Sequence, residues 1–111
     1  MKALEQAAEF LERASAMYHE SGYGDTAGQV LTKAAKLVDQ VNPRKAAGYF
    51  MATAELHTIE EKYRDSANAL KNAVNMYARA RDFDKILETS EKLRELYVQL
   101  QQHKRLYEVC E

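Results

Sequence analysis

The most regular pattern of hydrophobic and polar positions lies between residues 25 and 41. Apolar residues recur there at steps of three and four, which predicts an amphipathic helix with one buried stripe. The stripe consists of Ala27, Val30, Leu31, Ala34, Leu37, Val38 and Val41. Because Pro43 disfavours helical geometry at Asn42 and suits the first turn of a helix, one helix ends and another begins there.

The same pattern returns 39 residues further along the chain. The corresponding residues are Ala27 with Ser66, Leu31 with Leu70 and Ala34 with Ala73, and, in the preceding helix, Ala7 with Ala46, Phe10 with Tyr49 and Ala14 with Thr53. Turn positions follow one another every 19 or 20 residues, at Gly24, Pro43, Tyr63, Phe83 and His103. A helix pair of about forty residues that repeats in this way is typical of α-solenoids.

The predicted fold is therefore all-α, a TPR-like α-α solenoid of antiparallel helix pairs with five full helices and a partial sixth. The expected helices cover residues 2–21, 25–41, 43–61, 63–81, 83–101 and 103–111, in one domain that spans residues 1–111. The order small, large, small in the second helix of each pair is typical of tetratricopeptide repeats, although the unit is longer than their usual length of about 34 residues.

Composition and charge argue against several classes of protein. No apolar run approaches the about 20 residues that a membrane span needs. Sixteen basic and 17 acidic residues give a net charge of −1, so no overall field favours a nucleic acid or a membrane surface. The single cysteine, Cys110, excludes an internal disulfide framework and agrees with a reducing compartment such as the cytosol.

The sequence shows no spacing typical of metal ligands, a catalytic nucleophile or a phosphate-binding loop. It therefore predicts a protein that is not an enzyme and that uses no metal or cofactor. His19, His57 and His103 belong to three different units, and the pattern around His57 favours a packing residue over a ligand. Most aromatic residues recur at inward positions, which favours core packing over stacking on nucleic acid.

A surface for a protein partner is the remaining candidate for function. Residues 63–82 carry four basic against two acidic side chains, whereas residues 1–23 carry two against four. The basic residues that could form a strip on one side of the stack are Lys33, Lys36, Lys71, Arg79, Arg81 and Lys85. Such a strip would attract an acidic partner, and an ordinary solvated face is the alternative interpretation.

Two stretches carry a resemblance to a known family: MYHESGYGDTAGQVLTKAAKLVDQVNPRKAAGYF and YRDSANALKNAVNMYARARDFDKILETSEKLRELY. The resemblance depends on ordered features, which are Met17-Tyr18 at a helix end, Asp25-Thr26-Ala27 at a helix start, the Val41-Asn42-Pro43 break, and Arg79, Arg81, Phe83 and Asp84 around the fourth turn. Over essentially its whole length, the chain resembles the middle of the gamma-type members (gamma-SNAP) of the soluble NSF attachment protein family.

This resemblance implies a non-enzymatic adaptor that lies along SNARE bundles and recruits the hexameric ATPase NSF in vesicle trafficking. It also implies a cytoplasmic protein that reaches membranes only through its partners. Because family members are longer, we expect a fragment without the ATPase-binding end. The alternative is a generic TPR-like interaction module or a self-associating repeat module, and an apolar stripe near the end of the chain predicts weak end-to-end self-association. The stripe consists of Leu106, Tyr107, Val109 and Cys110.

Overall fold

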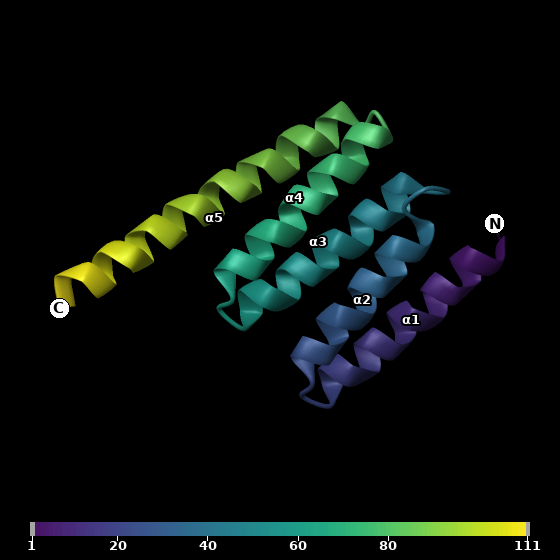
Figure 1. The fold of residues 1–111 in the computed structure, drawn as a ribbon, viewed down its shortest axis with the longest axis horizontal. Coiled ribbons are helices and arrows are strands. Elements are labelled where there is room, and N and C mark those ends of the chain that lie inside the picture. The colour runs from purple at the N-terminus through teal and green to yellow at the C-terminus, as the bar shows by residue number, and fades with distance from the viewer. Residues whose placement is uncertain (1, 111) are drawn as a thin grey trace.

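The computed structural model describes the backbone of residues 2–110 and the side chains of residues 2–102 and 104. Five helices follow one another, α1 (Lys2–Glu20), α2 (Gly24–Val38), α3 (Pro43–Ile59), α4 (Tyr63–Arg79) and α5 (Phe83–Cys110). Each helix runs antiparallel to the preceding one and packs mainly on its neighbours in the chain, as Figure 1 shows. The expected all-α, TPR-like solenoid is confirmed.

Side-chain contacts place alternate helices in two layers. Lys45 Nζ of α3 pairs with Glu9 of α1 at 3.1 Å, and the Thr89 hydroxyl of α5 donates to the Met51 sulfur of α3 at 3.9 Å. In the other layer, Asp25 of α2 pairs with Lys62, which precedes α4. The result is a thin slab of 53 × 36 × 15 Å, with α1 along one edge and α5 along the other (Figure 1).

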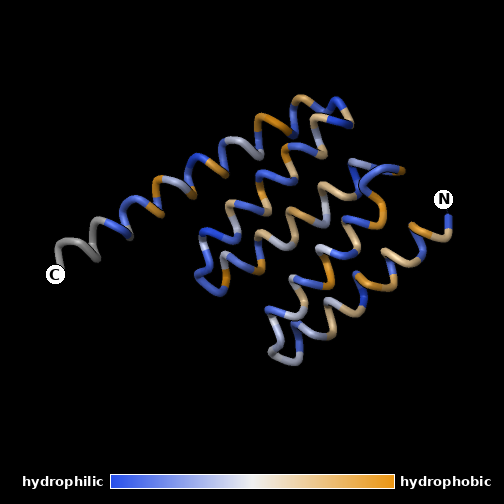
Figure 2. Tube along the Cα trace, in the orientation of Figure 1, coloured by the Kyte–Doolittle hydropathy of each residue, from blue (hydrophilic) through white to orange (hydrophobic). Residues whose placement is uncertain are grey.

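Small side chains allow the helices to approach closely in the core. The alanines with no exposed surface are Ala8, Ala27, Ala34, Ala35, Ala46, Ala47 and Ala73. Larger residues such as Leu31, Val38 and Phe50 fill the space between these contacts. In Figure 2, hydrophobic and hydrophilic positions alternate along the helices at the spacing expected for one apolar stripe on each helix.

One buried hydroxyl group joins the two helices within each repeat. The Ser15 hydroxyl of α1 donates to the Ala27 carbonyl of α2 at 3.0 Å. In the second repeat, the Ser66 hydroxyl of α4 donates to the Ala54 carbonyl of α3 at 2.9 Å. Positions 15 and 54, like positions 27 and 66, are 39 residues apart. Both repeats therefore form the same contact, with the donor and acceptor helices exchanged.

Three of the four turns end a helix with the same backbone arrangement. The second residue after the helix takes a positive φ, which is 89° at Gly22, 61° at Glu61 and 56° at Arg81. The following amide closes a long bond, from Tyr23 N to Tyr18 O at 2.8 Å, from Lys62 N to His57 O at 2.8 Å and from Asp82 N to Tyr77 O at 3.0 Å. At the remaining turn the Asn42 side chain accepts from Lys45 N at 3.2 Å, which confirms the predicted break before Pro43.

We expect Arg81→Gly to stabilise the protein, because glycine adopts a positive φ without the steric cost that a side chain incurs. The free energy of unfolding should rise by about 0.5–1 kcal/mol. Arg79→Gly is the matched control, since it removes the same side chain from the end of α4 and should lower stability by about 1 kcal/mol. Urea denaturation measures both, and a lower midpoint for Arg81→Gly would contradict the prediction.

The predicted boundary near His103 is wrong, because α5 continues from Phe83 to Cys110 as one helix. The stretch Leu100 to Lys104 contains no glycine or proline and none of the small polar residues that cap helices. Residues 103–110 therefore extend α5, and no separate sixth helix forms there. The other predicted boundaries lie within three residues of the observed ones. The predicted self-association stripe, from Leu106 to Cys110, lies outside the described side chains.

Candidate partner-binding surfaces

Among the described residues, no group of three or more His, Cys, Asp or Glu side chains is placed to hold a metal ion. No helix in the described part is long and apolar enough to cross a membrane. The features that remain for a functional site are surface hollows and exposed charges.

The first hollow, here called the α2–α4 hollow, opens between the two even-numbered helices and has a volume of about 550 Å³. It is lined by Asp25, Gly28, Gln29, Thr32, Lys33, Lys36, His57, Lys62 and Asp65. It lies at the end of the slab where α2 and α4 begin and α3 ends. Two of the predicted partner-binding residues, Lys33 and Lys36, therefore line the same cavity.

Two residues that line this hollow, Asp25 and Lys62, form an ion pair. Lys62 pairs with Asp25 and lies 3.9 Å from a Glu60 carboxylate oxygen. The hydrogen bond from Lys62 lowers the pKa of Asp25 below its usual value, and the same bond raises the pKa of Lys62. The pair thus adds stability above the ordinary pKa of an aspartate, and this contribution is lost as the pH falls through the lowered pKa of Asp25. No described residue forms an ion pair with Lys33 or Lys36, so both remain exposed cations.

His57 of α3 also lines the hollow. Its Nδ1 atom is buried and has no hydrogen-bond partner among the described residues. Gly28 of α2 faces the ring so closely that a Cβ there would lie 3.4 Å from His57 Cε1. His57 therefore packs between helices, as its sequence environment predicted.

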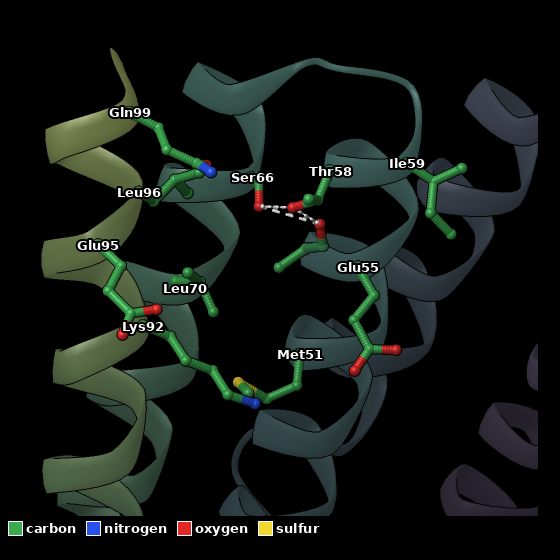
Figure 3. Close-up of a pocket in the computed structure, with 11 residues that line it drawn as sticks. Met51, Glu55, Thr58, Ile59, Ser66, Leu70, Lys92, Glu95, Leu96 and Gln99 are labelled. Atoms are coloured by element: carbon green, nitrogen blue, oxygen red, sulfur yellow. Dashed lines mark hydrogen bonds between the residues drawn. The ribbon is translucent and has the colours of Figure 1, made fainter. Parts of the chain in front are cut away.

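The second hollow, here called the α3–α5 groove, lies on the opposite layer and has a volume of about 460 Å³. It is lined by Met51, Ala54, Glu55, Thr58, Ile59, Ser66, Leu70, Lys92, Glu95, Leu96 and Gln99. Figure 3 shows α5 supplying the polar side, with Lys92, Glu95 and Gln99, while Leu70 of α4 lies between the two walls. At one end of the groove the Thr58 and Ser66 hydroxyls are 2.8 Å apart, and each also lies 2.9 Å from the Ala54 carbonyl oxygen.

Sequence reasoning missed the α3–α5 groove. The repeat itself contained the signal, because a period of two helices places α3 and α5 side by side above α4. The polar residues of α5 in the groove are spaced at three and four, which marks one face of a helix. Each of them alone resembles an ordinary solvated residue, so the pattern of polar positions did not distinguish the groove from open surface.

The six predicted partner-binding residues fall into three places. Lys33 and Lys36 line the α2–α4 hollow, whereas Lys71 Nζ lies 5.5 Å from the centre of the Tyr97 ring on α5. Arg79, Arg81 and Lys85 surround the turn between α4 and α5, at the opposite end of α4 from the hollow. Because α4 has 17 residues, it spans about 25 Å from the end near the hollow to the end near this turn.

The three cations at the α4–α5 turn differ in their partners. Lys85 pairs with Glu88 at 3.4 Å, one turn further along α5. No residue in the described part forms an ion pair with Arg79 or Arg81, and both are exposed. An isolated surface pair such as Lys85 with Glu88 is worth little, so it leaves Lys85 accessible to a partner.

A family model described as "Soluble NSF attachment protein, SNAP" matches residues 1–109. The match includes both hollows and all six basic residues, and it covers the repeat from its first helix to its last. It confirms the family that the sequence resembles. The chain belongs to the soluble NSF attachment protein family.

Proposed function

We propose that the chain is a non-enzymatic adaptor segment that binds SNARE bundles and takes part in the recruitment of NSF during vesicle trafficking. The observation that carries this proposal is the family match over residues 1–109. The solenoid supports it, because a stack of helix pairs presents an extended, rigid surface along which a rod-shaped partner can lie.

The gamma-type branch of the family is the more specific proposal. It is supported by the ordered sequence features around the Asn42-Pro43 break and the turn between α4 and α5. For this branch we propose a cytoplasmic location, with contact to membranes only through SNARE partners.

We further propose that the exposed cations form the contact with acidic side chains of the SNARE bundle. Arg79 and Arg81 carry this proposal most directly, because both are exposed and no described residue neutralises them. Lys33 and Lys36 would form a second point of contact at the other end of the slab. Two separated points of contact fit a long partner better than a compact one.

Reversal of the two arginines should weaken binding. We expect the double variant Arg79→Glu with Arg81→Glu to bind an assembled SNARE bundle at least about tenfold more weakly than the unaltered chain at low salt. Binding by the unaltered chain should also fade as added salt screens the charges. Fluorescence anisotropy with a labelled SNARE bundle measures both effects.

The matched control is Lys2→Glu with Arg13→Glu, which changes the net charge equally but lies on α1. It should leave binding almost unchanged. Arg81→Gly separates charge from stability, because it should weaken binding while stabilising the fold. Equal losses for the two charge reversals would show that only net charge matters, and would contradict a contact at the α4–α5 turn.

The α3–α5 groove favours a second candidate function, a generic TPR-like interaction module that takes a helical peptide between α3 and α5. Its apolar interior and polar wall resemble the environment that an amphipathic helix needs. Ile59 lines this groove and is exposed, so Ile59→Glu should preserve the fold. Salt-insensitive SNARE binding that is lost in Ile59→Glu would favour the groove over the cations.

A further inference from the structure

The layer of α1, α3 and α5 is held together differently on the two sides of α3. Between α1 and α3, Lys45 pairs with Glu9 at 3.1 Å. The Tyr49 hydroxyl also donates to a Glu12 carboxylate oxygen at 3.5 Å. A shift of 39 residues converts these four positions into Asp84, Gly48, Glu88 and Met51. Glycine has no side chain to pair with the aspartate, and a thioether has no hydrogen to donate to the glutamate. Both bridges are therefore lost between α3 and α5.

Two other contacts join α3 to α5 near the start of α5. Arg44 Nε lies 3.4 Å from an Asp82 carboxylate oxygen, and the Thr89 hydroxyl lies 3.9 Å from the Met51 sulfur. Beyond Met51, no hydrogen bond or ion pair between described side chains joins the two helices. The α3–α5 groove opens there and extends as far as Ile59, over about two helical turns or about 12 Å.

The groove would stay open in a longer stack of helices. Its walls are the facing sides of α3 and α5, and Leu70 of α4 lies between them. A further helix pair would pack against α1 or against the side of α5 that faces away from α3. An occupant of the groove therefore comes from outside the stack.

The buried part of the groove offers apolar contact. Leu70 and Leu96 are only 5% and 6% exposed, whereas Ile59 at one end is 68% exposed. The Thr58 and Ser66 hydroxyls bond to each other and to the Ala54 carbonyl, so neither needs a polar partner. Apolar side chains of about two helical turns would cover these residues and gain from their removal from water.

The walls of the groove are acidic overall. Figure 3 shows Glu55 of α3 on one wall and Glu95 of α5 on the other, and Lys92 is the one cation among the lining residues. None of these three forms an ion pair with another described residue. Two acids against one base give the lining a net charge of −1, whereas three lysines against two aspartates line the α2–α4 hollow. The two surfaces therefore favour partners of opposite charge.

From these observations we infer that the α3–α5 groove binds a basic amphipathic helix. Its apolar side carries large residues at steps of three and four and lies over Leu70 and Leu96. Lysines or arginines on its two flanks face Glu55 and Glu95. The inference rests on the second candidate function, a helical peptide between α3 and α5. It adds the charge of that partner, which is opposite to the charge of the partner proposed for the exposed cations.

The probe is a set of three synthetic peptides that differ only in charge. Each is an amphipathic helix of about 14 residues, held helical by a side-chain link, with leucine on one face and lysine, glutamine or glutamate on both flanks. We expect the lysine peptide to bind the 111-residue chain at least about tenfold more tightly than the glutamine peptide, and the glutamate peptide to bind most weakly. Isothermal titration calorimetry at about 0.15 M salt, where distant charges are screened, measures the affinities.

Charge reversal in the chain should invert this order. Glu55→Lys with Glu95→Lys should weaken binding of the lysine peptide at least about tenfold and strengthen binding of the glutamate peptide. Lys92→Gln should strengthen binding of the lysine peptide. The matched control is Glu20→Lys with Glu91→Lys, which changes the net charge equally at exposed residues outside the groove and should leave the order unchanged.

A neutral variant tests the groove itself. Ile59→Gln removes an exposed apolar contact without a change of charge, so it should weaken binding of the lysine and glutamine peptides alike. Thermal unfolding of each variant checks that the fold is retained.

The candidate function and the inference fail in different ways. If no peptide binds, or if binding is unaffected by Ile59→Gln, the groove is not a helix site and both are overturned. If the lysine and glutamine peptides bind equally tightly and Ile59→Gln weakens both, the helix site stands and only the basic partner is overturned. A dimer of the chain that Ile59→Gln dissociates in sedimentation equilibrium would make a second copy the occupant and would also overturn the inference. Affinities that fall from lysine to glutamine to glutamate, and that the double reversal inverts, support it.

Discussion

Leu31→Ala should lower the free energy of unfolding by about 2–5 kcal/mol, the cost of removing a large side chain from a packed core. Leu31 is 5% exposed and belongs to the cluster that joins α1, α2, α3 and α4. Because the neighbouring alanines already bring the helices into close contact, little movement is available to fill the cavity. Urea denaturation followed by far-ultraviolet circular dichroism measures the change.

Leu87→Ala is the matched control for this prediction. Leu87 is 68% exposed on α5, so the same substitution should change stability by less than about 0.5 kcal/mol. If the two variants unfolded at the same urea concentration, Leu31, the large residue in the small-large-small pattern of α2, would not be buried. That result would contradict the packing on which the solenoid assignment depends.

The sequence predicted the helices well because their determinants are local. The stripe around Leu31 and the Asn42-Pro43 break each depend on residues a few positions apart, and the structure contains both. The continuation of α5 past His103 was missed because the expected turn was extrapolated from spacing alone. Spacing indicates where a turn would keep the repeat in register, but a helix ends only where capping and contacts favour a turn.

The candidate surfaces were harder to predict, because they depend on which helices lie side by side. The pattern identified Lys33 and Arg79 as exposed cations, but it did not separate the hollow that contains Lys33 from the turn beside Arg79. It also made Phe10 the equivalent of Tyr49, but Tyr49 is buried whereas Phe10 is exposed. Helical periodicity indicates that a face is apolar, and only the arrangement of neighbours decides whether that face is covered.

Both repeats contain a buried hydrogen bond from a serine hydroxyl to a backbone carbonyl, and this bond allows a test of the repeat that does not depend on the hydrophobic pattern. Ser66 is 1% exposed, and its hydroxyl both donates to the Ala54 carbonyl and contacts the Thr58 hydroxyl. Ser66→Ala leaves these buried groups with fewer partners and should cost about 1–2 kcal/mol of stability. The first repeat forms the same contact from the opposite helix, through Ser15 of α1.

Ala54→Ser should therefore rescue Ser66→Ala, because position 54 is the equivalent of Ser15 and position 66 is the equivalent of Ala27. In the double variant, the hydroxyl on α3 can donate to the carbonyl of residue 66, as Ser15 donates to Ala27 at 3.0 Å. We expect the double variant to recover most of the lost stability, whereas Ala54→Ser alone crowds two hydroxyls into one buried site and should destabilise the protein. A double-mutant cycle in urea measures this coupling. Additive effects of the two substitutions would show that the two repeats are not equivalent at this contact, even though their sequences align with a shift of 39 residues.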